Sequence, residues 1–437
     1  MTRTCASVGS SDELIHIGGA ELIEIRMDIF GDIPPGINVP MIVKITDDGQ
    51  LVRCADRICN GYMDIGERRR PTTGIGIIAS VHDTERTWAA EDIAERLNSF
   101  DCDIAKGAFA VRSPSDLVAI HEASLSIKRP HILIGMGELG MITRIRSDLL
   151  GIQFMYAHTG TPTAPGQLSV KESVSIGDDH MVLGLFGHPL SHSFSAKMMS
   201  RALSDAGIAG SYLNFDVPSI DDAEEMIRCY GIRGANVTVP YKTDIIGCLD
   251  SLDMAAESTG AVNTILNDDG RLIGYNTDVS GAGYALERSG IPDPNGMRIL
   301  IMGSGGAARA CTYLFTTEGS EVDIAGRNPV TVSRLCREFG CGIRDDGDPR
   351  GYDMIVNCTP VGMYSDSGYP VRIDEIDSDQ TVFDITYGGI SPLIRIASER
   401  GCRLVHGIDM LIGQGMRSFE IWTGITPDPV SMRSAIS

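Results

Sequence analysis

The sequence predicts an α/β protein in two parts: a compact barrel of eight β/α units, followed by a two-lobed α/β part. Three observations support this prediction. Eight short apolar segments recur within the first 175 of the 437 residues, as expected for a closed (β/α)8 barrel. Further on, residues 236–242 read as a strand with one polar and one apolar face. Beyond these, residues 298–309 form an apolar strand that runs into a glycine turn and a helix start, the arrangement of a nucleotide-binding lobe.

The barrel prediction rests on the spacing of the apolar segments. The expected strands are residues 4–8, 20–28, 41–46, 62–66, 74–82, 103–106, 131–136 and 152–157. This part is short, because such barrels typically need roughly 250 residues. The first helix in particular is almost absent between Val8 and Glu21. An active site is expected at the C-terminal ends of the strands.

Charged side chains follow the expected barrel strands. Glu24, Arg26 and Asp28 share one strand face, which is costly unless they are paired or face a polar site. His82 and Lys106 end neighbouring strands. A desolvated lysine amine can form an imine with a ketone, and a nearby histidine can remove the proton that the imine acidifies.

Together these motifs resemble a type I 3-dehydroquinate dehydratase. The resemblance implies a Schiff-base lysine at Lys106 and a proton-transferring His82. It also implies seven substrate-binding residues: Glu24, Arg26, Lys44, Asp48, Arg144, Thr163 and Gln167. The family has arginine and glutamate where this chain has Lys44 and Asp48. Asp48 is expected to help orient His82, although its side chain is one methylene shorter than glutamate.

The second part begins with the polar-faced strand. Asn236, Thr238 and Lys242 point the same way if residues 236–242 are extended. A lysine there can give or take a proton once its surroundings lower its pKa. Two polar turns follow, containing Asn263 and Asp278. They supply amides and one carboxylate.

The glycine turn matches a dinucleotide fingerprint with alanine in its last position, Gly303-x-Gly305-x-x-Ala308. Such turns bring backbone close to a pyrophosphate, which then sits at the helix N-terminus. The expected cofactor-binding residues of the turn are Gly303, Ser304, Gly305, Gly306 and Ala307.

Arg327 and Asn328 follow the next strand, about 20 residues past the turn, where an acidic residue would bind the ribose of NAD. A guanidinium instead suits a 2′-phosphate. The sequence therefore predicts a Rossmann-type lobe that binds NADP(H).

From about residue 181 to the C-terminus, these motifs resemble shikimate dehydrogenase. The resemblance implies that Lys242 and Asp278 form a catalytic pair. It implies substrate binding by Ser193, Ser195, Thr238, Asn263, Tyr387 and Gln414. The family usually has proline after the second serine, where this chain has Ala196. That difference is expected to loosen the loop without removing a ligand.

The expected domains are a barrel over 1–175, a substrate-binding α/β lobe over 181–279 plus 404–437, and the NADP-binding lobe over 280–403. Polar residues 171–180 are expected to link the two parts. The expected ligands are 3-dehydroquinate, 3-dehydroshikimate, shikimate and NADP(H), with no metal. A homodimer is an assembly that the sequence allows.

Composition excludes other classes. The net charge of −21 argues against nucleic acid or an anionic membrane as a partner, and no apolar run approaches the ~18 residues of a membrane span. None of the eleven cysteines lies in a Cys-x-x-Cys pair. Reduced core thiols and a cytoplasmic location are expected.

The function expected from these resemblances is bifunctional: dehydration of 3-dehydroquinate, then reduction of the product with NADPH. Two alternatives stay open within enzymes. The second half can act on quinate, or only the dehydrogenase can be active while the short barrel serves as a scaffold. A metabolite sensor is a third alternative. A sensor needs no proton chemistry, so the residues suited to it argue against this alternative: Lys106, His82, Lys242 and Asp278.

Overall fold

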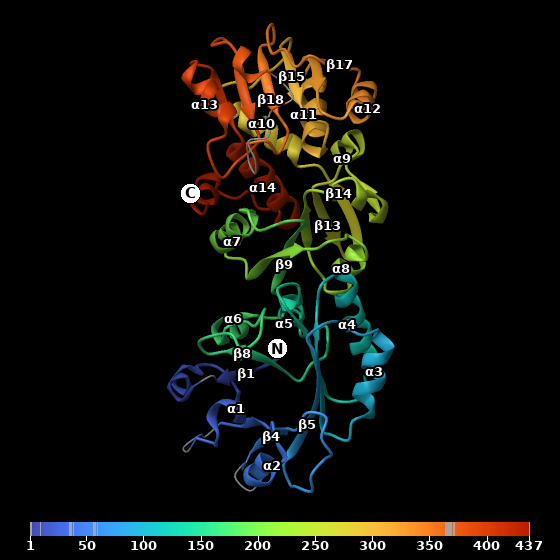
Figure 1. The fold of residues 1–437 in the computed structure, drawn as a ribbon, viewed down its shortest axis with the longest axis vertical. Coiled ribbons are helices and arrows are strands. Elements are labelled where there is room, and N and C mark those ends of the chain that lie inside the picture. The colour runs from blue at the N-terminus through green and yellow to red at the C-terminus, as the bar shows by residue number, and fades with distance from the viewer. Residues whose placement is uncertain are drawn as a thin grey trace. The chain divides into compact units, whose positions relative to one another are not determined.

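A computed structural model describes residues 2–8, 10–34, 37, 39–55, 58, 60–362, 369 and 372–436. Two compact units make up the chain (Figure 1). The first contains Met1–Val182 and Asn214–Ile232, and the second contains Leu183–Leu213 and Arg233–Ser437.

Eight parallel strands form the barrel of the first unit, in the order β7-β6-β5-β4-β3-β2-β1-β8. They are β1 (Arg3–Val8), β2 (Leu22–Arg26), β3 (Met41–Lys44), β4 (Gly61–Asp64), β5 (Gly76–Asp83), β6 (Ile104–Ala110), β7 (His131–Met136) and β8 (Phe154–His158). A backbone hydrogen bond of 3.0 Å from Gln153 N to His131 O joins the two ends of this order. The predicted barrel is confirmed, with strand ends shifted by a few residues.

The barrel is short because several of its connections are reduced. Between β1 and β2 lies only a 3-10 turn, η1 (Ser11–His16). Residues 65–75, which join β4 to β5, are all described and contain no helix. The remaining helices are α1 (Met27–Phe30), α2 (Asp48–Ala55), α3 (Ala90–Ser99), α4 (Pro114–Ser126), η2 (Leu139–Met141), α5 (Ile142–Ile145) and α6 (Val170–Ser175).

Helix α6 corrects the expected linker over 171–180. A capping box between Ser169 and Glu172 starts this helix, satisfying backbone donors at its N-terminus. The Ser173 and Thr4 hydroxyls lie 3.0 Å apart. The first half of the expected linker is therefore part of the barrel unit.

Alternating residues of the strands face the inside and outside of the barrel. Cys5, Leu22, Ile42, Phe154 and Tyr156 belong to one buried apolar cluster. Neighbours of four of them, namely Ala6, Ile23, Val43 and Ala157, belong to another cluster, which also contains Cys54 of α2 and Val170 of α6. This alternation places the side chains of every second residue along each strand into the barrel interior.

The segment Asn214–Ile232 adds helix α8 (Ala223–Cys229) to the first unit. The Tyr230 hydroxyl donates a 2.9 Å hydrogen bond to the carbonyl of Leu117 in α4. A 5.8 Å contact between the Tyr230 and His121 rings adds to this packing.

A six-stranded mixed sheet, in the order β10-β9-β11-β13-β14-β12, precedes the dinucleotide lobe in sequence. Its strands are β9 (Met181–Gly187), β10 (Gly210–Asp216), β11 (Gly234–Val237), β12 (Ser251–Leu252), β13 (Thr264–Asp268) and β14 (Arg271–Tyr275). Its helices in the second unit are α7 (Ser195–Asp205), η3 (Asp244–Cys248), α9 (Met254–Thr259), α14 (Gly407–Thr423) and α15 (Pro429–Ser434).

The other sheet of the second unit is entirely parallel, in the order β17-β16-β15-β18-β19-β20. Its strands are β15 (Arg298–Met302), β16 (Glu321–Ala325), β17 (Gly342–Ile343), β18 (Met354–Asn357), β19 (Thr381–Asp384) and β20 (Arg403–His406). Counted within this lobe, the order is 3-2-1-4-5-6, which is the doubly wound Rossmann arrangement. The strand order reverses between β15 and β18, where such folds bind their ligands.

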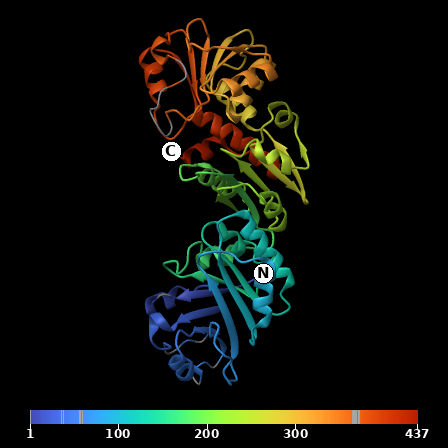
Figure 2. The ribbon, with the colours of Figure 1, turned by 45° about the vertical axis from the view of Figure 1, so that its right-hand side comes forward.

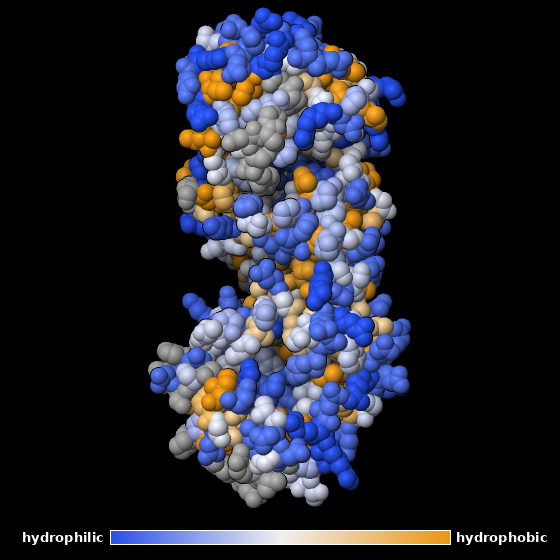
Figure 3. Space-filling view, viewed as in Figure 1, coloured by the Kyte–Doolittle hydropathy of each residue, from blue (hydrophilic) through white to orange (hydrophobic). Residues whose placement is uncertain are grey.

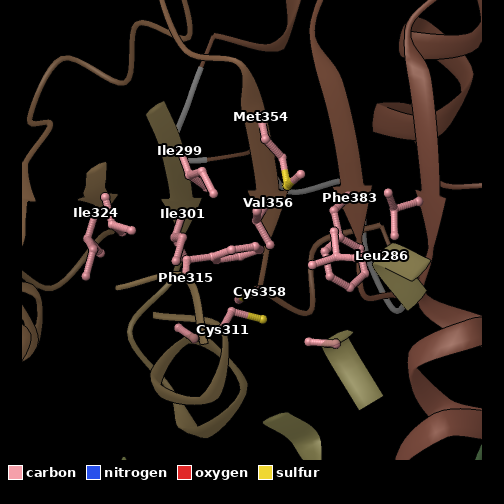
Figure 4. Close-up of a cluster of buried hydrophobic side chains, with 14 of the residues drawn as sticks. Leu286, Ile299, Ile301, Cys311, Phe315, Ile324, Met354, Val356, Cys358 and Phe383 are labelled. Carbon is pink, nitrogen blue, oxygen red and sulfur yellow. The ribbon is translucent and has the colours of Figure 1, made fainter. Parts of the chain in front are cut away.

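Helices cover both faces of this parallel sheet: α10 (Asp278–Arg288), α11 (Gly306–Thr317) and α12 (Pro329–Phe339) on one, and α13 (Pro392–Glu399) on the other (Figures 1 and 2). Phe315 of α11 lies among strand residues such as Ile301 and Val356 (Figure 4). Leu300 and Met302 face the opposite side, toward Leu393 of α13. Strands buried on both faces explain the continuous apolar run at residues 299–302.

Hydrophilic residues predominate on the face shown in Figure 3, as the charge of −21 leads one to expect. Among the residues placed by the structure, helices long and apolar enough to cross a membrane are not found.

Candidate active sites

Lys106 lies inside the barrel, where it is 4% exposed. Its Nζ donates a 3.2 Å hydrogen bond to Asp64 Oδ2 and lies 3.9 Å from Glu24 Oε1. The same ammonium lies 4.1 Å from the centroid of the Tyr156 ring, a cation–π arrangement. These four side chains come from β2, β4, β6 and β8. Alternate strands thus supply one interior layer, as barrels of this class do.

The layer holds Lys106 as an ammonium. Burial opposes its charge, but the carboxylates of Asp64 and Glu24 outweigh that effect, and the pKa of Lys106 is raised. Burial likewise opposes ionisation of Asp64, yet Lys106, Lys44 and hydrogen bonds from Ser80 and Gly66 lower the pKa of Asp64. The Ser80 hydroxyl donates to Asp64 at 2.6 Å. Lys106 must therefore lose a proton before its amine can attack a carbonyl.

His82 occupies the C-terminal half of β5, where the residue is exposed. Although the residue is exposed, surrounding protein atoms partly desolvate its imidazole, and this desolvation together with the positive charges of Lys106 and Lys44 lowers the pKa of His82 to about 4. Its imidazole is neutral at pH 7, which is the form that accepts a proton.

Asp48 does not join this cluster, contrary to the sequence expectation. It begins α2, its side chain is 91% exposed, and it accepts a 3.0 Å hydrogen bond from Arg68. Asp64, which was not predicted, supplies the buried carboxylate instead. Asp64 lies within the expected strand 62–66 and ends β4, and this strand-end position made it a candidate without distinguishing it from Asp48.

Two predicted cations line the end of the strands near Glu24. The Arg26 guanidinium binds Asp28 through bonds of 2.6 and 3.2 Å. Burial and the neighbouring Lys106 lower the pKa of Lys44. The charge of Arg26 interacts with that of Glu24. The charge of Lys44 interacts with those of Lys106, Asp64 and Glu24.

Arg144 is a buried cation, 3% exposed, whose Nη1 donates to Gly135 O at 2.7 Å. Within the described residues its buried Nε has no hydrogen-bond partner and no carboxylate lies within 4 Å. Burial lowers the pKa of Arg144 to about 10. Because an unpaired buried charge is costly, this site fits an anionic group of a ligand.

Thr163 and Gln167 lie together in the loop after β8. Gln167 Oε1 accepts hydrogen bonds from Thr163 N at 2.8 Å and Thr163 Oγ1 at 3.0 Å. No described contact joins either side chain to Lys106.

The second unit contains a cavity of about 760 Å³ between its two lobes. All fifteen residues predicted for this half line it: Ser193, Ser195, Thr238, Lys242, Asn263, Asp278, Gly303, Ser304, Gly305, Gly306, Ala307, Arg327, Asn328, Tyr387 and Gln414. Its volume is in the range of small-molecule and cofactor sites.

Lys242 and Asp278 form an ion pair in this cavity, with Nζ donating to Oδ2. Their side chains are 16% and 8% exposed. Asn263 Nδ2 donates to the other carboxylate oxygen of Asp278 at 2.9 Å. A lysine held on a fixed carboxylate can pass a proton to or from a substrate oxygen.

The backbone that carries Lys242 is a turn and not the expected strand. β11 ends at Val237, and residues 239–243 are turns. Pro240 has no N–H to continue a strand ladder. Lys242 therefore projects from a turn, and it does not share a strand face with Asn236, which bonds to Tyr212 at 2.8 Å.

Hydroxyl and amide groups occupy the other side of the cavity. Ser195 begins α7, and its backbone N–H donates to Ser193 Oγ at 3.2 Å. The Tyr387 ring lies 5.7 Å from that of Phe194. Gln414 Oε1 accepts from Asn263 at 3.5 Å. These hydroxyl and amide groups suit a hydroxylated carboxylic acid.

The glycine turn lies between β15 and α11, at the point where the strand order reverses. Gly303 has φ +113°, and a Cβ there would lie 3.0 Å from Cys358 O, so a side chain is disfavoured. Gly305 caps α11 without a side chain. The free backbone N–H groups at this helix start fit a phosphate group.

Arg327 is exposed at the cavity edge, and no carboxylate lies within 4 Å of its guanidinium in the described ranges. Asn328 Oδ1 accepts from Val330 N at 3.0 Å and Thr331 N at 3.3 Å, which caps α12. The unpaired guanidinium and the absence of an acid at residues 326–328 fit a phosphorylated ribose.

A group of three or more side chains able to hold a metal ion was not found among the residues that the structure describes.

Family models match three stretches of the chain. Residues 62–176 match type I 3-dehydroquinase, residues 185–265 match the shikimate dehydrogenase substrate binding domain, and residues 407–436 match the shikimate 5′-dehydrogenase C-terminal domain.

Similar proteins include shikimate dehydrogenases (NADP(+)) from Methanococcus maripaludis and Methanopyrus kandleri. Both are 38% identical, over 59% and 60% of this chain and 96% and 97% of theirs. A shikimate 5-dehydrogenase from Thermus thermophilus, solved with NADP(H) and shikimate, is 34% identical with a TM-score of 0.55, over 58% of this chain and 98% of that one.

A dehydroquinate dehydratase and shikimate dehydrogenase from S. pombe resembles the whole chain in fold. The likeness covers 100% of this chain and 98% of that one, at 22% identity and a TM-score of 0.51.

Proposed function

The chain belongs to the shikimate dehydrogenase family and carries a type I 3-dehydroquinase domain ahead of it, and from this we propose how its residues perform two consecutive reactions. The first unit dehydrates 3-dehydroquinate to 3-dehydroshikimate, and the second reduces that product to shikimate with NADPH. Both kinds of domain match in this one chain, as in a bifunctional shikimate-pathway enzyme.

In the barrel, the Lys106 amine attacks the substrate ketone, and loss of water gives an imine. The neutral His82 removes the proton made acidic by the imine and then gives it to the substrate hydroxyl, which leaves as water. Hydrolysis of the imine frees 3-dehydroshikimate and restores Lys106. The buried guanidinium of Arg144 fits the substrate carboxylate.

In the second unit, Ser193 and Ser195 hold the carboxylate, while Thr238, Asn263 and Gln414 bind ring hydroxyls. Lys242 gives a proton to the ketone oxygen as the hydroxyl forms, and Asp278 holds the lysine in place. When bound, NADPH would supply the hydride, while Gly303–Gly306 would hold its pyrophosphate and Arg327 its 2′-phosphate.

The observation that carries this proposal is the pair of shielded lysines, each with its own carboxylate. The test is an assay with 3-dehydroquinate plus NADPH. We expect NADPH oxidation and shikimate formation without added dehydratase. If NADPH is oxidised with 3-dehydroshikimate but not with 3-dehydroquinate, the barrel is only a scaffold. Comparing shikimate with quinate as the substrate to be oxidised tests the quinate alternative.

Asp64→Asn is expected to shift the pH dependence of dehydration. Asp64 favours the ammonium form of Lys106, whereas imine formation needs the free amine. The limb of the pH profile of kcat/KM that reports the Lys106 pKa therefore rises with pH. Without the carboxylate, burial lowers the pKa of Lys106, and the limb moves to lower pH by at least ~1 unit. The matched control is Asp101→Asn, whose side chain is 86% exposed. An unmoved limb would contradict the role of Asp64.

Arg327→Ala is expected to raise the KM for NADPH by about 10- to 100-fold, since a hydrogen bond to a charged group contributes ~1.5–3 kcal/mol. The KM for NADH should change less than about 2-fold, because NADH lacks the 2′-phosphate. Arg337→Ala is the control, since Arg337 is exposed in the same region and does not line the cavity. Equal losses with both cofactors would reject the phosphate role.

We also propose a cytoplasmic location, supported by the free thiols of eight described cysteines: Cys5, Cys102, Cys229, Cys311, Cys336, Cys341, Cys358 and Cys402. A homodimer stays a prediction, which sedimentation of the purified enzyme tests.

A further inference from the structure

Helix α11 contacts the substrate-binding lobe through one largely buried arginine. Arg309 lies in the first turn of α11, and its side chain is 15% exposed. Its Nε donates to the carbonyl of Thr259, which ends α9. Gly260 has φ +58°, and a Cβ there would lie 3.0 Å from Arg309 Nη2. The absence of a side chain at Gly260 therefore leaves room for the Arg309 guanidinium.

The guanidinium is held from the α12 side as well. Its Nη2 pairs with Glu338, and its Cζ lies 5.6 Å from the centroid of the Phe339 ring. Glu338 also pairs with Arg334 at 2.9 Å, whose side chain is 75% exposed. Glu338 thus has two arginine partners, and one of them, Arg309, also donates to the substrate lobe.

Hydrogen bonds continue from Thr259 to the backbone of Asp278, the residue that carries the proposed catalytic carboxylate. Asn276 Nδ2 donates to Thr259 Oγ1 at 2.9 Å. Asn276 Oδ1 in turn accepts from the backbone N–H of Asp278 at 3.1 Å. Thr259, Asn276 and Asp278 are all buried, so this connection is shielded from competing water.

The start of α11 also contacts the other member of the catalytic pair. A Cβ at Gly306 would lie 3.0 Å from Lys242 Cδ. The first turn of α11, which offers its N–H groups to a pyrophosphate, therefore touches the stem of Lys242 and connects through Arg309 to Asp278.

We propose that Arg309 is a positioning residue for hydride and proton transfer, which fixes α11 against the Thr259–Asn276–Asp278 connection. It contacts neither reacting atom. It fixes the position of the bound dinucleotide relative to the Lys242–Asp278 pair. A misplacement of about 1 Å between reacting groups can lower the rate ~100-fold. This inference rests on the proposed dehydrogenase function.

The test compares Arg309→Gln with Arg334→Gln, its matched control on the shared Glu338. For Arg309→Gln we expect kcat for shikimate oxidation to fall about 10- to 100-fold, while the KM for shikimate changes less than about 3-fold. Arg334→Gln should stay within about 2-fold of the wild type in both. Arg309→Lys, which keeps one donor for the Thr259 carbonyl, should recover part of the lost kcat. Dehydratase activity of the same preparations reports on the intact chain.

An unchanged kcat in Arg309→Gln, or a rise in the KM for NADP alone, would overturn the inference. If Arg309→Gln loses both activities, Arg309→Lys decides: a lowered kcat with unchanged dehydration supports positioning, and wild-type kcat contradicts it. A wild-type enzyme without NADP-linked shikimate oxidation would instead refute the proposed function itself.

Discussion

Replacing Lys106 with alanine is expected to lower the rate of 3-dehydroquinate dehydration by more than about 1,000-fold, since the loss of one member of a catalytic unit removes most of its effect. NADP-linked shikimate oxidation should stay within about 2-fold of the wild type. The reason is chemical: Lys106 is the amine that the barrel layer surrounds with Asp64, Glu24 and Tyr156. Separate assays of the two reactions check this result.

Lys106→Ala also leaves two buried carboxylates without their cation, so a loss of stability by about 3–5 kcal/mol is expected for the first unit. Shikimate oxidation by the same protein reports on the second unit, and circular dichroism reports on the barrel. The matched control is Lys128→Ala, because Lys128 is exposed in the same unit. Dehydration at more than a few per cent of the wild-type rate would rule out a covalent role for Lys106.

Replacing Lys242 with methionine is expected to have the reverse effect. Shikimate oxidation should fall about 100- to 10,000-fold, the usual range for loss of positioned proton transfer, while dehydration is unchanged. Methionine keeps an apolar stem beside Gly306, where the lysine Cδ now lies. The KM for NADP should therefore change little, and kcat should carry the loss.

The control for this change is Lys197→Met, in helix α7 of the same unit. Lys197 does not line the cavity. A Lys242→Met enzyme that keeps wild-type kcat would show that another group or water transfers the proton.

Much of the fold could be predicted because its signals are local. The barrel strands are short apolar segments whose ends carry charged residues, so their number and order follow from the sequence. The glycine turn at Gly303–Gly306 lies between a strand and a helix, and its neighbours determine where β15 and α11 begin. The cavity residues of the second unit follow from motifs that lie at strand and helix ends.

The acidic residue beside Lys106 could not be chosen from spacing alone. Asp48 and Asp64 both lie near strand ends. What distinguishes them is that the Asp64 side chain, at the end of β4, points into the barrel. Asp48 begins a helix, where its side chain meets Arg68. Asp64 ends a strand, and its side chain falls in the layer of Lys106 and Ser80.

Contacts between segments far apart in the chain could not be predicted from the sequence either. Arg309 and Thr259 are fifty positions apart, and nothing local to either predicts their bond. The polar residues 171–180 suggested a linker, yet the cap at Ser169 starts α6. The turn that carries Lys242 shows the same limit, since its geometry depends on the chain beyond β11.

The account depends most on the claim that the two shielded lysines do separate work, one covalent and one in proton transfer. Its most direct test is borohydride reduction during turnover of 3-dehydroquinate, followed by mass measurement of the peptides. The account predicts a reduced adduct on the peptide that contains Lys106 and none on the peptide that contains Lys242. An unlabelled Lys106 under turnover, or an adduct on Lys242, would contradict it.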